Sequence, residues 1–110
     1  MTLVVPYDGG KLSDAAVLRA AQFQEVLGEE VKAVTVIPRG NAEYARKKGW
    51  LDASESFDKE RIVERLEENI AEIDSSVDFT PIIVDRFAQR GTVSNAIRKF
   101  ARNHDAGFVI

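Results

Sequence analysis

The chain has 110 residues, of which 45% are hydrophobic and 30% charged, and it carries a formal net charge of −3. This length and composition predict one globular domain, and the acidic balance gives no electrostatic reason to bind nucleic acid. Because the sequence lacks cysteine, a basic signal-peptide start and any apolar run near the ~20 residues that cross a membrane, we expect a cytoplasmic protein without disulfides.

The first predicted element is a buried strand over residues 3–5, three consecutive apolar residues that end at Pro6. Asp8 and the pair Gly9–Gly10 follow, and glycine lets a ligand approach the backbone closely. A strand, an acidic residue, a glycine turn and a helix N-terminus together are typical of a nucleotide-facing edge in an open α/β sheet. The alternative is that Asp8 only caps the glycine turn. Neither the standard dinucleotide motif nor the Walker motif is present.

A helix is predicted over residues 12–27, with Ser13 as its N-cap and Gly28 at its C-terminal end. Its apolar residues recur at helical spacing on one expected inner face: Ala16, Ala20, Phe23 and Leu27. A β-rich segment over 31–37 follows and stops at Pro38. A helix between two such strands predicts a βαβ unit and therefore a parallel pair of strands.

Residues 38–57 are the least regular part of the sequence, with a short helix expected from Asn41 through Lys48. We interpret Trp50 as an anchor that packs this segment onto the sheet; the alternative is that it stacks on an adenine. The segment also contains four basic residues, which we interpret as a solvated surface and alternatively as cations that reach a bound phosphate. They are Arg39, Arg46, Lys47 and Lys48.

The clearest helix begins at Asp58 and is expected to run to about Ser75, with isoleucine and leucine residues along one face. Residues 79–86 predict a third strand. Pro81 lies inside this strand, and it indicates an edge position because a central strand needs the missing N–H.

A last helix is predicted from Gly91, followed by a fourth strand over residues 107–110. The order βαβαβαβ predicts a doubly wound parallel α/β sheet, with ligands bound beyond the carboxyl ends of the strands. The chain ends inside an apolar strand, so we expect either a C-terminal truncation, which we favour, or a second subunit that covers this strand.

Several of these segments, taken in their order and spacing, resemble the universal stress protein family. They are Val4–Gly10, the Ser13–Ala16 opening of the first helix, Ala33–Ile37 after Gly28, and the last helix and strand over 91–110. The resemblance implies a three-layer, Rossmann-like sheet of the adenine nucleotide alpha hydrolase-like type, over a single domain of residues 1–110. It also implies a homodimer or higher homo-oligomer and, in one subclass, bound ATP or AMP, with Mg²⁺ accompanying ATP.

The resemblance assigns Pro6, Tyr7, Asp8 and Val36 as candidate cofactor-binding residues, and Gly9 joins them because a glycine there permits close ligand approach. The end of the first strand lies against the adenosine in the nucleotide-binding subclass, and the backbone at Val36 meets the adenine. The phosphate loop of that subclass is glycine-rich and, like the fifth strand, would follow Ile110. A chain without that loop is alternatively expected to hold no cofactor.

Two classes of function follow from these residues. The first is a module that binds an adenine nucleotide for sensing or signalling in a stress response, without partners among nucleic acids or membranes. The second is a homo-oligomeric interaction protein of the same fold that binds no nucleotide. We predict no catalytic and no metal-binding residues, interpret His104 as structural, and allow at most a slow ATP hydrolysis.

Overall fold

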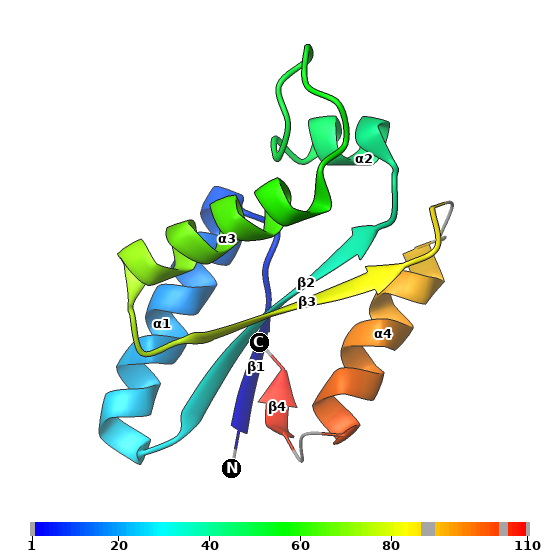
Figure 1. Ribbon diagram of the computed structural model, residues 1–110. Coiled ribbons are helices and arrows are strands. Elements are labelled where there is room, and N and C mark those ends of the chain that lie inside the picture. Colours follow the sequence, from blue (N-terminus) through cyan, green and yellow to red (C-terminus); the bar gives the residue numbers. More distant parts are fainter. Residues whose placement is uncertain (1, 87–89, 104–105, 110) are drawn as a thin grey trace.

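Strands and helices follow one another in the order that the sequence predicts, with two helices between the second and third strands (Figure 1). The structure is a computed structural model that describes residues 2–86, 90–103 and 106–109; His104 lies outside the described residues. The elements are β1 (Thr2–Pro6), α1 (Lys11–Leu27), β2 (Glu30–Pro38), α2 (Ala42–Lys47), α3 (Lys59–Ile73), β3 (Asp78–Val84), α4 (Arg90–Asn103) and β4 (Ala106–Val109).

The four described strands form one parallel sheet in the order β3-β2-β1-β4. β1 pairs with β2 from Thr2 opposite Glu30 to Pro6 opposite Val34. The first two strands therefore lie side by side and point the same way, as the predicted βαβ unit requires. The predicted parallel α/β fold is confirmed.

Pro81 lies in β3, which is an outer strand of the described sheet, so its predicted edge position is confirmed. The Arg39 N–H donates to the Val84 carbonyl at 2.9 Å. Peptide groups of a strand alternate in direction, so the even-numbered residues of β3 face β2 and Pro81 faces the open edge. The nitrogen that cannot donate a hydrogen bond thus faces away from β2, on the side where none of the described strands pairs with β3.

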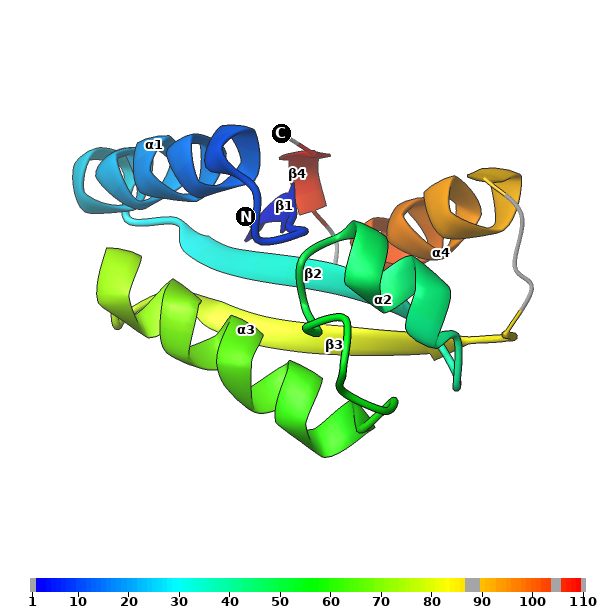
Figure 2. The same cartoon turned by 90° about the horizontal axis from the view of Figure 1, so that it is seen from above.

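Helices cover both faces of the sheet, which gives three layers (Figure 2). α1 and α3 lie on one face and contact each other, and α4 lies on the opposite face. Because side chains of a strand alternate between the faces, Leu3 and Val5 belong to the larger core beneath α1 and α3. Val4 belongs to a smaller core beneath α4, together with Val34 and Ala101.

The caps of three helices follow the predicted local chemistry. The side chains of Asn41 and Asp58 accept hydrogen bonds from backbone N–H groups in the first turns of α2 and α3, and both were predicted as helix starts. Gly28 ends α1 in the left-handed conformation, with φ of 68°. α3 ends at Ile73, two residues before the predicted Ser75.

The predicted N-cap of α1 is wrong. The cap is Gly10, and Ser13 lies inside the first turn, where its hydroxyl donates to the Asp8 carboxylate at 2.8 Å. The acidic residue of the preceding loop recruits this hydroxyl, so Ser13 stabilises the loop instead of the helix end.

The predicted inner face of α1 is also partly wrong. Val17, Ala20 and Ala21 are the buried residues of this helix, whereas Phe23 is 44% exposed and Leu27 56% exposed. The two small alanine side chains let the helix pack closely against the sheet, and this rotates the larger apolar residues outward. In the described part of the chain, no helix is both long and apolar enough to cross a membrane.

The loop between α2 and α3 is tied to α3 by a carboxylate–guanidinium pair. Arg65 donates to both carboxylate oxygens of Glu55 at 3.0 Å, and the Asp52 N–H donates at 2.9 Å. These hydrogen bonds, that of Arg65 foremost, lower the pKa of Glu55 from its ordinary value of 4.5 to about 2. The contact therefore stabilises the folded state above pH 4.5, and the stabilisation is lost as the pH falls toward 2.

We therefore expect Glu55→Gln to unfold at a lower urea concentration than the wild type at pH 7. The difference is expected to shrink as the pH falls below 4.5 and to vanish only below about pH 2, where Glu55 is protonated in both states. Urea denaturation at a series of pH values measures this. Glu67→Gln, at an exposed carboxylate of α3, serves as control and is expected to match the wild type. A difference that stays constant with pH would contradict the assignment.

Candidate functional site

A cavity of about 460 Å³ opens at the carboxyl ends of β1 and β2. Its volume lies in the range of small-molecule sites. Residues of β1, β2 and α4 form an apolar wall, and residues of the β1–α1 loop and the segment after β2 form a polar wall. The cavity is therefore where the topology of a doubly wound sheet places a ligand.

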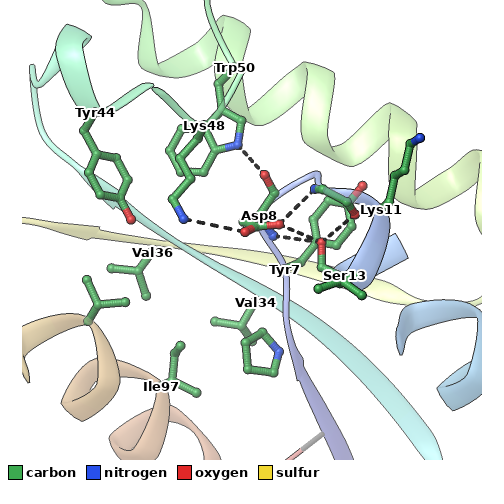
Figure 3. A pocket seen from close by; sticks show the side chains of 14 residues that line it. Tyr7, Asp8, Lys11, Ser13, Val34, Val36, Tyr44, Lys48, Trp50 and Ile97 are labelled. Atoms are coloured by element: carbon green, nitrogen blue, oxygen red, sulfur yellow. Dashed lines mark hydrogen bonds and ion pairs between the residues drawn. The ribbon is translucent and has the colours of Figure 1, made fainter. Parts of the chain in front are cut away.

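The apolar wall is built from short aliphatic side chains of separate elements (Figure 3). Val34 and Val36 reach it from β2, Pro6 from the end of β1, and Val93 and Ile97 from α4. A flat, apolar ring system is the kind of group that such a surface buries favourably.

The backbone of Val36 faces the space above the end of β1. The Tyr7 N–H donates to the Val34 carbonyl at 2.8 Å, so the peptide groups of even-numbered residues of β2 turn toward β1. The register pairs β1 with β2 only as far as Pro6 and Val34. Val36 lies two residues beyond Val34, so its N–H and C=O point to the side where the paired part of β1 has ended, as one donor and one acceptor.

Asp8 stabilises the glycine turn and faces the cavity with its remaining oxygen (Figure 3). Its Oδ1 accepts hydrogen bonds from the Gly10 N–H at 2.9 Å and from the Ser13 hydroxyl at 2.8 Å. Its Oδ2 lies 3.6 Å from the Lys48 Nζ. The expected cap of the turn is therefore present, and it uses one oxygen of the carboxylate.

The surroundings of Asp8 keep its carboxyl charged at neutral pH. Burial acts to raise the pKa, but the hydrogen bonds from Gly10 and Ser13 and the ammonium of Lys48 outweigh burial and hold the pKa below its ordinary value. A charged Oδ2 is a strong acceptor for a hydroxyl group.

The segment after β2 forms the polar wall. Trp50 is 5% exposed and its indole N–H donates to the Asp8 carbonyl at 2.7 Å, so its predicted role as an anchor is confirmed. The Tyr44 ring contacts the Trp50 ring edge-on with 5.7 Å between centroids. Lys48 lies 5.7 Å from the centre of the Tyr44 ring. Anchoring Trp50 thus also positions Tyr44 and Lys48 at the cavity (Figure 3).

Tyr7 joins the strand end to the core. Its hydroxyl donates to Asp14 Oδ1 at 2.7 Å, and burial first, then Asp14, raises the pKa of this hydroxyl above its ordinary value. Its carbonyl accepts the hydroxyl of Thr35 at 2.8 Å. Thr35 is only 1% exposed, so this hydrogen bond is shielded from water.

We expect Thr35→Val to lower the free energy of unfolding by about 1–2 kcal/mol, because valine keeps the shape of threonine but leaves the Tyr7 carbonyl without its donor. Urea denaturation measures the change. Thr35→Ser keeps the hydroxyl and is the control for the loss of the hydrogen bond. If Thr35→Val were as stable as the wild type, the hydrogen bond would carry no net stabilisation.

The predicted site residues fall into two groups in the structure. Pro6, Tyr7, Asp8 and Val36 line the cavity together. Gly9 is absent from its lining and has φ of 84°, and a Cβ there would lie 3.5 Å from Leu66. Gly9 therefore allows the backbone conformation of the turn and its close packing against Leu66.

Several lining residues were not among the predicted cofactor-binding residues. Tyr44 and Lys48 are four residues apart, a spacing that places both on one side of a helix. Val93 and Ile97 share the same spacing on α4. The solvated interpretation of the basic residues fits the exposed Arg39, Arg46 and Lys47, but Lys48 belongs to the cavity wall. Among the residues that the structure describes, no group of three metal-binding side chains is found.

A family model, the universal stress protein family, matches residues 1–110. Among solved structures, a universal stress protein in complex with cAMP matches with a TM-score of 0.60 and 18% identity, over 99% of this chain and 69% of that chain. A universal stress protein from Archaeoglobus fulgidus matches with a TM-score of 0.56 and 16% identity, over 99% and 72%. No curated protein matches the sequence significantly.

Proposed function

Since the chain belongs to the universal stress protein family, we propose that it binds an adenine nucleotide in the cavity at the ends of β1 and β2. It acts by binding, as a cytoplasmic sensing or signalling module of a stress response. Binding changes the affinity of the protein for its partners, and turnover of the nucleotide is not required.

The observation that carries the proposal is that Asp8 and Val36 face one cavity from two neighbouring strand ends. Val36 offers a backbone donor and acceptor to the edge of a base, as a purine amino group and ring nitrogen require. Asp8 Oδ2 offers a charged acceptor to a ribose hydroxyl. The aliphatic residues around Val36 supply the apolar contact for the ring.

The side chains around the cavity support binding without catalysis. The Ser13 hydroxyl donates to Asp8 and also lies 3.0 Å from the Gly10 carbonyl. The proton of the Ser13 hydroxyl is thus held within the loop, and the lowered pKa makes the Asp8 carboxylate a weak base for its removal. The contacts of Asp8 with Gly10 and Ser13 therefore stabilise the turn and do not activate a nucleophile.

Titration calorimetry with the whole chain tests the proposal. One solved universal stress protein binds cAMP, so the ligands are ATP, AMP, cAMP and adenosine, with GMP as the control for the base. Binding of at least one adenine ligand and weaker binding of GMP are expected. Absence of heat with every adenine ligand would contradict the proposal.

A homo-oligomeric interaction protein is the second candidate, and the surface of α1 favours it. Large apolar side chains of this helix are exposed: Leu12 at 90%, Val26 at 80%, Leu27 at 56% and Leu18 at 49%. These side chains are available to pack against another protein. Sedimentation velocity without nucleotide tests this candidate, and a monomer at every concentration would contradict it.

A further inference from the structure

We propose that Lys48 is a phosphate-recognising residue of this cavity, so that the cavity selects an adenine nucleotide over the uncharged nucleoside adenosine. The inference rests on the proposed function, because it assigns a part of the ligand to a residue of the same cavity.

The position of Lys48 distinguishes it from the other basic residues of its segment. Lys48 follows the last residue of α2, lines the cavity, and directs its ammonium toward Asp8 (Figure 3). The neighbouring Lys47 is exposed and is not part of the cavity lining. Lys11 belongs to the lining, but its side chain extends away from the other labelled residues (Figure 3).

The contacts of Lys48 hold its ammonium inside the mouth of the cavity. The Nζ lies 3.6 Å from Asp8 Oδ2 and 5.7 Å from the centre of the Tyr44 ring. Tyr44 is itself held by Trp50, whose indole is bonded to the backbone of Asp8. The cation is therefore positioned by the same anchor that builds the polar wall.

The hydrogen bonds of Asp8 explain why a phosphate needs this cation. Oδ1 is already used by Gly10 and Ser13, which leaves Oδ2 for a ribose hydroxyl. A ribose hydroxyl that donates to Asp8 Oδ2 occupies the acceptor that Lys48 faces in the structure. The phosphate of the same nucleotide then lies close to the charged Asp8 carboxylate. Lys48 then pairs with the phosphate and offsets the repulsion between the two anions.

The exchange of partners is favourable because the existing pair is weak. The side chains of Lys48 and Asp8 are 37% and 48% exposed, and a separation of 3.6 Å is long for a charge-assisted hydrogen bond. A phosphate offers several charged oxygens to the same ammonium, so little is lost and a stronger contact is gained.

Titration calorimetry of adenosine, AMP and cAMP with the wild type, Lys48→Met and Lys47→Met tests the inference. Methionine keeps the length and apolar stem of lysine but removes the charge. We expect Lys48→Met to lose about ten- to hundredfold in affinity for AMP and cAMP, while adenosine affinity stays within about threefold. Lys47→Met is expected to leave all affinities unchanged, and Lys48→Arg is expected to retain most of the affinity for phosphate.

The outcomes separate the inference from the proposed function. If the wild type binds none of these ligands, the proposed function and the inference about Lys48 both fail. If it binds AMP and adenosine and Lys48→Met weakens both equally or neither, the inference alone fails, because Lys48 then acts on the fold or not at all. Circular dichroism and urea denaturation check that each variant is folded, and Lys48→Gln gives the same comparison if Lys48→Met is unstable.

Discussion

Trp50→Ala is expected to lower the free energy of unfolding by about 3–5 kcal/mol, as truncation of a buried large aromatic residue does. Trp50 is 5% exposed within the larger core, and its indole N–H donates to the Asp8 carbonyl at 2.7 Å. The substitution removes the packing against Tyr44 and leaves that carbonyl without its donor. A loss of this size is a large part of the roughly 5–15 kcal/mol that stabilises a domain.

The measurement is urea denaturation followed by far-ultraviolet circular dichroism, since Trp50 is the only tryptophan and its fluorescence is lost in the variant. Trp50→Phe is the control, because it keeps an aromatic ring in the core and removes the N–H. It is expected to fall between the wild type and Trp50→Ala. Equal unfolding midpoints for Trp50→Ala and the wild type would mean that the segment after β2 is not anchored in this way.

Asp8→Asn is expected to reduce the affinity for AMP by about ten- to hundredfold, which corresponds to the loss of one hydrogen bond to a charged acceptor. The amide keeps one oxygen for the Gly10 N–H and the Ser13 hydroxyl, so the turn is retained. Its NH₂ group replaces Oδ2 on the side of Lys48 and the cavity. The acceptor for a ribose hydroxyl is thereby removed with little change to the fold.

Asp8→Ala separates the two roles of this residue. It is expected to lose the same affinity as Asp8→Asn and, in addition, about 1–2 kcal/mol of stability, because the turn loses its acceptor. Calorimetry with AMP and adenosine, together with urea denaturation, measures both effects. Unlike Lys48→Met, both Asp8 variants are expected to weaken adenosine. Wild-type affinity in Asp8→Asn would remove Asp8 from the site.

The sheet was predictable because its signals are local. Apolar β-branched runs bounded by proline or glycine predict strands, and a helix between each pair requires a parallel arrangement. Pro81 predicted an edge strand because its nitrogen carries no hydrogen to donate. Asn41 and Asp58 marked helix starts through side chains that reach only a few residues along the chain.

The inner face of α1 was not predictable in the same way. Ala16, Ala20, Phe23 and Leu27 have helical spacing, and so do Val17, Ala20, Ala21 and Gln24. Periodicity alone does not choose between two such stripes on one helix. The choice is made by how closely the helix approaches the sheet, and this favours the small residues Ala20 and Ala21.

The candidate site was likewise predictable only in part. Asp8 and Val36 were brought together by topology, since the carboxyl ends of adjacent parallel strands meet at one edge of a sheet. Lys48 and Ile97 reach the cavity only because α2 and α4 pack where they do. Their positions depend on contacts between segments far apart in the sequence, which a reading of local patterns does not contain.

The position of Pro81 limits the capacity of β3, an outer strand of the described sheet, to recruit another chain. A further strand beside β3 would need a row of backbone donors, and Pro81 interrupts that row in the middle of Asp78–Val84. Addition of a strand from a second copy is therefore disfavoured at β3. The fold thus protects this margin against open-ended polymerisation through strand addition.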